Sequence, residues 1–293
     1  MSIDSQRPKA ESPRFDPYRA VPGEERKRRC LAFIDHLERR DGIPDLSNRT
    51  LSKRELFFQE LDAEPVRWRG ALDREMFYRY LDQKAGPSID QKVLWLLAAA
   101  KSNLNERYGV ELALRDPALV RAAEKDPVRR FVLLEEVYHT RILLDACKTF
   151  GLEFELPDPS PRTRVFIHLC TELPEQLREL VVLCGEIVAA NCFQILLEKT
   201  DLFSEEPGVA ARLRLLVREI LADELGHVAY CSLRVAPVGL RVSRWLVPMI
   251  ARKFLDDTPE FISLAGGLIP FLSRLERFDI GADPDVRALA FAA

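Results

Sequence analysis

Two five-residue stretches of the chain combine carboxylates and a histidine in the same order, acid-Glu-x-x-His. They are Glu135–His139 (EEVYH) and Asp223–His227 (DELGH), and together they contain two of the four histidines. Residues three apart lie on one face of an α-helix, so the Glu and the His of each stretch can point toward one place. Carboxylates combined with imidazoles suit Fe(II), with Mn as the competing ion. Two such stretches that face each other could therefore hold two metal ions.

Both stretches lie within long helical patterns. Apolar residues recur there with the helical period, and proline or glycine marks most of the ends. At 1.5 Å per residue each helix would be about 30 Å long or longer, as in a four-helix bundle. The four predicted helices are about Ile89–Tyr108 with Gly109 as the stop, Pro127–Phe150 with Gly151 as the stop, Pro174–Thr200, and Pro207–Val235.

A bundle that binds two metals takes one Glu from each of two helices and Glu-x-x-His from each of the other two. In the third helix we expect Glu186, because its neighbours are apolar and a buried charge needs a partner or a metal. In the first helix we expect Glu106, with Glu111 as the alternative. The predicted metal ligands are therefore Glu106, Glu136, His139, Glu186, Glu224 and His227.

Each motif also begins with an acid, Glu135 or Asp223. A metal-bound imidazole usually donates its other ring N–H to a carboxylate, which fixes the tautomer and the orientation of the ring. An acid one residue away from a ligand points toward a neighbouring helix and not toward its own metal. We therefore expect Asp223 to support His139 and Glu135 to support His227.

The composition is that of a helical protein with a full core. The 293 residues are 47% apolar and 30% charged, with only 13 glycines, and helix formers dominate. A net charge of −3 gives no reason to expect nucleic acid as a partner. The sequence has no signal-peptide pattern and no apolar run of about 18 residues, so we expect a cytoplasmic protein without a spanning helix. The six cysteines are expected to be reduced thiols.

Four regions are predicted along the chain. Residues 1–23 form an extended or disordered arm, and residues 24–88 form helices that pack on the bundle of residues 89–235. Residues 236–293 form a C-terminal helical extension, in which apolar side chains alternate with arginines. Packing against the bundle is the expected role of this extension, and a contact with a membrane surface or a subunit is the alternative.

From about Ile89 to Val235 these residues resemble the ferritin-like di-iron carboxylate proteins, in particular bacterial oxygenases with a doubled (Asp/Glu)-Glu-x-x-His motif. In size and layout the chain is similar to the p-aminobenzoate N-oxygenase type. That type has a further His one turn before the Glu of the fourth helix, where this chain has Ile220. The difference weakens the expectation of arylamine N-oxygenation and leaves a site of four Glu and two His.

The resemblance implies an all-α, ferritin-like bundle and an O₂-activating non-haem di-iron oxidoreductase, of the oxygenase, hydroxylase or N-oxygenase type. Its substrate would be a small organic molecule, with O₂ as co-substrate and a reductase or other electron donor as partner. A homodimer is the default expectation. A ferroxidase or other iron-handling protein, and a metal-free helical binding protein, are the alternatives. The shape of a substrate pocket would depend on how the residues around Trp95, Ala99, Ala190, Phe193 and Val228 pack, which helical periodicity does not give.

Overall fold

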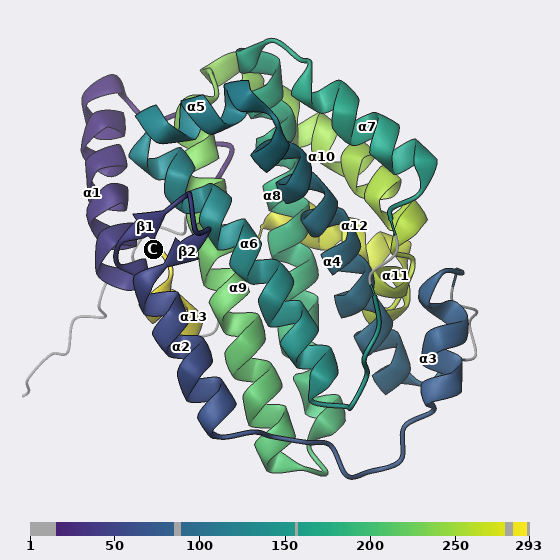
Figure 1. The fold of residues 1–293 in the computed structure, drawn as a ribbon. Coiled ribbons are helices and arrows are strands. Elements are labelled where there is room, and N and C mark those ends of the chain that lie inside the picture. The colour runs from purple at the N-terminus through teal and green to yellow at the C-terminus, as the bar shows by residue number, and fades with distance from the viewer. Residues whose placement is uncertain (1–15, 85–88, 156–157, 279–283, 292–293) are drawn as a thin grey trace, which may run out of the picture.

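The protein is built almost entirely of helices. The computed structural model describes residues 16–84, 89–155, 158–278 and 284–291. These residues form 13 α-helices, one short 3-10 helix and a two-stranded antiparallel ribbon of β1 (Pro44–Asp45) and β2 (Thr50–Leu51) (Figure 1). The prediction of an all-α protein is therefore confirmed.

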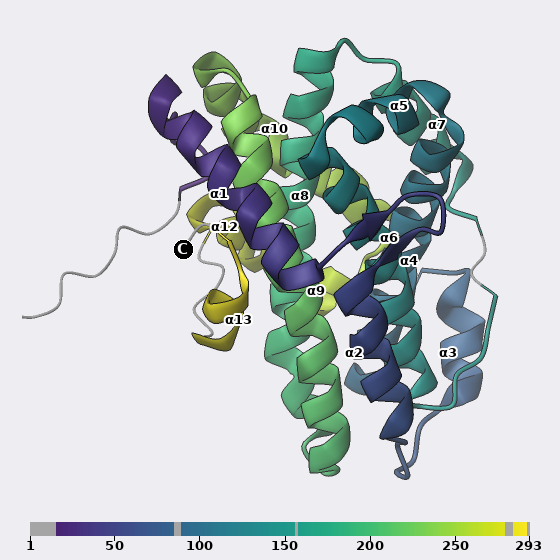
Figure 2. The same cartoon turned by 60° about the vertical axis from the view of Figure 1, so that its left-hand side comes forward.

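Four long helices lie side by side at the centre of the molecule. Helix α8 packs along α9, α4 packs along α6, and α6 also contacts α9 (Figures 1 and 2). Aspartate side chains begin two of them by accepting backbone N–H groups: Asp90 accepts from Lys92 and Val93, and Asp126 accepts from Val128 and Arg129. The four helices are α4 (Gln91–Arg115), α6 (Pro127–Lys148), α8 (Glu175–Glu198) and α9 (Pro207–Arg234).

Helix α4 is longer than the sequence indicated, and the predicted stop at Gly109 is wrong. Gly109 keeps a right-handed helical conformation, and the helix continues to Arg115. Beyond the glycine, the side chain of Glu111 accepts a hydrogen bond from Arg115 at 3.1 Å, which supports the last turn. The helix ends where Asp116 accepts the backbone N–H of Ala118 and starts the next helix.

Gly151 does have the role predicted for it. Helix α6 ends at Lys148, and Gly151 has a φ of 64°, in the left-handed region that glycine adopts without strain. A Cβ at this position would lie 3.0 Å from Nη2 of Arg74, so the close approach of that side chain also favours glycine.

The remaining helices surround the central four. Helix α1 packs on α6 and α9, α3 packs on α4, α10 packs on α8, and α13 packs on α9. The buried apolar side chains form one cluster that extends from Phe33 in α1 to Val286 in α13. These helices are α1 (Gly23–Asp41), α2 (Ser52–Ala63), α3 (Arg74–Leu81), α5 (Pro117–Lys125), α7 (Pro161–Thr171), η1 (Lys199–Phe203), α10 (Pro237–Asp257), α11 (Glu260–Leu264), α12 (Leu268–Arg277) and α13 (Pro284–Leu289).

The four predicted regions are only partly visible in the fold. The predicted arm of residues 1–23 falls mostly on residues 1–15, which lie outside the described residues. Helices from the second and the fourth region both pack on the central helices. The exact boundaries between the regions stay a prediction.

Within the described residues, one helical stretch is long and apolar enough to cross a membrane. It is Glu175–Phe203, which comprises α8 and η1, and 72% of its most apolar window is buried inside the protein. The central helix of a helical assembly passes the same test by length and composition, so this finding is weak evidence for a span.

Candidate metal centre

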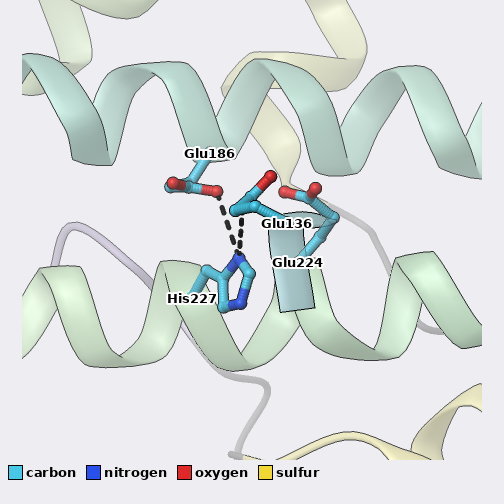
Figure 3. A group of neighbouring side chains, drawn as sticks. All are labelled: Glu136, Glu186, Glu224 and His227. Carbon is cyan, nitrogen blue, oxygen red and sulfur yellow. Dashed lines mark ion pairs between the residues drawn. The ribbon is translucent and has the colours of Figure 1, made fainter. Parts of the chain in front are cut away.

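The central helices bring all six predicted ligands to one place. Their carboxylate and imidazole atoms form two groups, each with its atoms within 4.8 Å of one another, and Glu136 belongs to both. One group is Glu136, Glu186, Glu224 and His227, and the other is Glu106, Glu136 and His139. Figure 3 shows the side chains of the first group converging from α6, α8 and α9.

Glu136 lies between the two histidines. Its Oε1 is 3.1 Å from Nδ1 of His227, and its Oε2 is 3.4 Å from Nδ1 of His139. The two imidazole rings are 5.8 Å apart, centroid to centroid. One carboxylate thus presents one oxygen to each ring, which is the arrangement of a carboxylate that bridges two metal ions.

The other carboxylates complete the two halves of the centre. Oε1 of Glu224 lies 3.4 Å from Nδ1 of His139, and Oε2 of Glu186 lies 3.6 Å from Nδ1 of His227. Glu106 joins His139 and Glu136 from α4. The alternative, Glu111, is not in either group; its carboxylate pairs with Arg115. The structure therefore brings Glu106, and not Glu111, to the centre.

The acids that precede the motifs orient the two rings. Nε2 of His139 lies 3.1 Å from Oδ2 of Asp223, and Nε2 of His227 lies 2.9 Å from Oε2 of Glu135. These crossed pairs are the ones expected from the sequence. The pKa of Asp223 is lowered well below its ordinary value, so this carboxylate is ionised and accepts the hydrogen bond from Nε2 of His139, whereas burial raises the pKa of Glu135 to about 8. Nδ1 of each ring then faces the cluster of predicted ligands, and a metal ion would take the place of the proton on Nδ1.

The centre is buried, and several of its polar atoms have no hydrogen-bond partner within the described part of the chain. These atoms are Nδ1 of both His139 and His227, Oε2 of Glu106 and Oε2 of Glu224. The two histidine side chains are fully buried. Unpaired buried polar atoms are costly, and all four belong to residues of the two groups described above. The donor set therefore fits a pair of divalent cations, which would satisfy all four atoms.

Burial and crowding perturb the acid–base equilibria of the centre. Burial raises the pKa of Glu106 to about 8, and burial with the nearby Glu186 and Glu136 raises the pKa of Glu224 well above its ordinary value. Burial opposes ionisation of Glu136 too, but the two histidines lower its pKa. Against the effect of burial, the surrounding carboxylates raise the pKa of His139 and that of His227. Protons thus balance the negative charge in the metal-free centre.

Two arginines that the sequence analysis missed hold Asp223 in place. Nη2 of Arg54 donates to both carboxylate oxygens of Asp223, at 2.7 and 2.8 Å, and Nη1 of Arg40 donates to Oδ1. Burial would raise the pKa of Asp223, but these two guanidinium groups lower it well below its usual range. The same arginines donate to Glu219, one turn before Asp223 on α9. This pair of acids on one helix face is the signal that could have indicated cationic partners.

An apolar cavity of about 480 Å³ opens onto four of the predicted ligands. Glu106, Glu136, Glu186 and Glu224 form one part of its wall. The rest of the wall comes mainly from α4, α5, α6, α7 and α8, with side chains such as Val110, Leu119, Val132, Ile167 and Val182. A small apolar molecule in this cavity would lie directly beside the carboxylates.

The residues named in the sequence analysis do not shape this cavity. These residues, namely Trp95, Ala99, Ala190, Phe193 and Val228, are all buried in the core and do not line it. They lie on helix faces that other helices cover, whereas the open side of the centre faces α5 and α7. Ile220 is also fully buried and offers no ligand atom, so the centre has the four Glu and two His expected.

Tyr138, beside the first motif, has a structural role. Its hydroxyl donates to Oε1 of Glu55 at 2.5 Å and accepts the backbone N–H of Leu51, and its ring stacks on Phe58. Tyr230, beside the second motif, lines the cavity and donates to Oδ2 of Asp126.

Comparison of the chain with protein-family models, with curated proteins and with solved structures finds no match. The geometry of the side chains therefore carries every functional argument that follows.

Proposed function

We propose that the protein is a non-haem di-iron oxygenase whose four central helices form a ferritin-like bundle. The observation that carries the proposal is Glu136, which presents one oxygen to Nδ1 of each of two histidines. Its support is the convergence of four Glu and two His, with unpaired donor atoms, in a buried centre. Oxygen and imidazole ligands of this kind suit iron, and manganese is the competing metal.

The chain would divide its ligands between two ions. His139 and Glu106 would hold one ion, His227 and Glu186 would hold the other, and Glu136 and Glu224 would lie between them. Two ferrous ions bound in this way would supply electrons for the reduction of O₂ and thus the oxidising power for attack on a substrate. Asp223 and Glu135 would keep the proton of each ring on Nε2 and so keep each Nδ1 free for coordination.

The cavity supports an oxygenase more than an iron-handling protein. Its volume of about 480 Å³ lies within the usual range for small-molecule sites, and its wall is mostly apolar. Such a wall binds and orients an organic molecule beside the carboxylates and excludes water from the centre. A route for hydrated iron ions would need a wall dominated by charged groups, whereas here Arg129, Arg178 and Glu179 are the charged side chains outside the centre and apolar area predominates. The proposal therefore includes a small, largely apolar substrate, O₂ as co-substrate, and an external reductase or other electron donor.

The proposal is tested by anaerobic titration with Fe(II), for which we expect two ions per chain. Glu136→Ala removes the carboxylate between the histidines and should abolish binding of the second ion and weaken that of the first, while the far-ultraviolet circular dichroism stays helical. The matched control is Glu111→Ala on α4, which lies outside the centre and should keep two ions. Full loading of Glu136→Ala, or no loading of the wild-type protein with Fe(II) or Mn(II), would overturn the proposal.

The two alternative functions give different results in the same preparation. An iron-handling protein would continue to oxidise and accumulate iron, with many ions per chain and a cage-like assembly in sedimentation. A metal-free binding protein would take up neither metal. For an oxygenase we expect the number of iron ions per chain to stay at two in the presence of O₂ and excess iron.

A further inference from the structure

Helix α10 has an exposed face that neither the metal centre nor the core explains. Val238 is 69% exposed, Trp245 is 79% exposed and Met249 is 63% exposed. Arg241 and Arg252 are also exposed on this helix. Large apolar side chains of this kind are costly to leave in water and mark a contact surface when they occur together.

These residues form one stripe along the helix. At about 100° per residue, Val238, Arg241, Trp245, Met249 and Arg252 fall within about 80° of one another, and the stripe is about 21 Å long. Leu240, Val247 and Ala251, on the opposite side of the helix, are buried. Helix α10 packs on α8, on the side of α8 away from α6 (Figures 1 and 2). The apolar and cationic residues of the stripe thus face outward together.

The charges of the stripe are of one sign. Arg241 and Arg252 form no ion pair with any residue in the described part of the chain, and α10 contains no acid before Asp256. Arg244, at the edge of the stripe, pairs with Asp16 at 3.4 Å, and its guanidinium lies over the ring of Tyr18. From Val238 to Arg252 the stripe is therefore positive, and the exposed Asp256, one turn further on the same face, marks its end.

An open groove of about 710 Å³ runs beside the stripe. Trp245, Pro248, Met249 and Leu275 give it an apolar wall. Arg244, Arg252 and Glu276 are the charged groups at its border. The groove therefore offers apolar surface next to exposed cations, which matches the chemistry of a phospholipid with its acyl chain and its anionic headgroup.

We propose that this face of α10, defined by Val238, Arg241, Trp245, Met249 and Arg252, docks on the surface of an anionic lipid bilayer. The apolar side chains would enter the boundary between headgroups and acyl chains, and the arginines would contact the phosphates. Tryptophan is the side chain that most favours this depth of a bilayer. Self-association fits less well, because a two-fold contact would bring the arginines of two copies together. The inference goes beyond the proposed oxygenase function and does not depend on it.

Trp245 is a built-in probe of this contact. The chain has three tryptophans, and the other two, Trp68 and Trp95, are buried. With vesicles of phosphatidylglycerol we expect a blue shift of tryptophan emission and co-sedimentation of the protein, both weakened by added salt. With vesicles of phosphatidylcholine alone we expect neither. No shift and no co-sedimentation with the anionic vesicles at low ionic strength would overturn the proposal.

Paired variants separate the stripe from general surface charge. Arg241→Gln combined with Arg252→Gln should weaken vesicle binding about 25-fold, since each arginine near an anionic surface contributes about fivefold. Met249→Gln should weaken it by removing an inserted apolar group. The controls are Arg39→Gln on α1 and Leu56→Gln on α2, both exposed in the described structure and far from α10 in sequence. Equal losses in the controls would show non-specific adsorption and overturn the assignment.

Self-association would give a different result. Without vesicles, tryptophan emission would shift to the blue as the protein concentration rises, and sedimentation equilibrium would give a doubled mass. That outcome would assign the face to a second copy of the chain and overturn the lipid proposal.

The Glu136→Ala variant serves as an internal check. It should bind vesicles as well as the wild type, so that failure of the metal proposal and failure of the lipid proposal are distinguishable.

Discussion

Asp223 determines how His139 is presented to the centre, and it is itself fixed by two arginines. Oδ2 of Asp223 is 3.1 Å from Nε2 of His139, and both of its oxygens accept hydrogen bonds from Arg54. Asp223 is only 2% exposed, so its charge is stabilised by these groups and not by water. The orientation of one proposed metal ligand thus depends on residues far away in the sequence.

Replacement of Asp223 by Asn should weaken metal binding without removing a ligand. Loss of the charge that supports a metal-bound imidazole typically costs about 10–100-fold in metal affinity. We expect this loss for Mn(II) in a calorimetric titration of Asp223→Asn. The control is Asp201→Asn, in which the replaced side chain is 79% exposed and pairs with Arg214. Unchanged affinity in Asp223→Asn would contradict the supporting role of this carboxylate.

Metal binding should become stronger as the pH rises. In the metal-free protein burial raises the pKa of Glu106 to about 8, so Glu106 keeps its proton at neutral pH. The surrounding carboxylates raise the pKa values of His139 and His227. A cation must displace these protons, so each increase in pH lowers the cost of binding. We therefore expect proton release on addition of Mn(II), measured in a weakly buffered solution, and an affinity that increases from pH 6 to about pH 8. A metal affinity that is independent of pH would contradict the displacement of protons by the metal.

At the level of elements, two glycines within long helices differ in what surrounds them. Gly185 in α8 lines the cavity, and a Cβ at this position would meet nothing within 4 Å. Gly226 in α9 lies against the ring of Phe33, and a Cβ there would be 3.0 Å from Cε2 of that ring. Packing therefore explains the glycine in α9, whereas the glycine in α8 leaves space in the cavity.

This difference predicts that alanine stabilises the protein more at position 185 than at position 226. Gly185→Ala should stabilise the protein by up to about 1 kcal/mol, because alanine favours the helical conformation and nothing opposes its methyl group. Gly226→Ala should gain less or lose stability, since the buried ring of Phe33 has little room to move. Urea unfolding measures both values. A larger gain in stability for Gly226→Ala than for Gly185→Ala would contradict the packing role given to Gly226.

At the level of the whole molecule, the six predicted ligands come together at one site from four different helices. They come from α4, α6, α8 and α9, so the binding free energy of a metal at this point stabilises the folded state as a whole. The flanking helices α1 and α2 also contact the site, because Arg40 and Arg54 donate hydrogen bonds to Asp223 on α9. A metal bound by these residues would therefore couple its binding to folding.

Addition of metal should raise the unfolding temperature, and a chelator should reverse the effect. At a free metal concentration 1,000 times the dissociation constant the expected stabilisation is about 4 kcal/mol, which corresponds to several degrees for a chain of this size. Scanning calorimetry with Mn(II), followed by addition of EDTA, measures the shift. Glu136→Ala should show little shift, and a shift equal to that of the wild type would contradict its place in the centre.

The sequence by itself determined what depends on local spacing. The helical period places Glu136 with His139 and Glu224 with His227, and it sends Glu135 and Asp223 toward neighbouring helices, which was enough to predict the crossed hydrogen bonds. The prevalence of helix formers, the few glycines and the helical period of the apolar residues were enough to predict an all-α fold. Iron, the reductase, the homodimer and the cytoplasmic location stay predictions.

Only the tertiary structure decided which helix faces meet. It extended α4 past Gly109, brought the predicted Glu106 to the centre and left the alternative Glu111 outside it, and added Arg40 and Arg54 around Asp223. It also placed the cavity toward α5 and α7. The physical reason is that these outcomes depend on packing between segments far apart in the chain, whereas the period of a helix reports only on residues one or two turns apart.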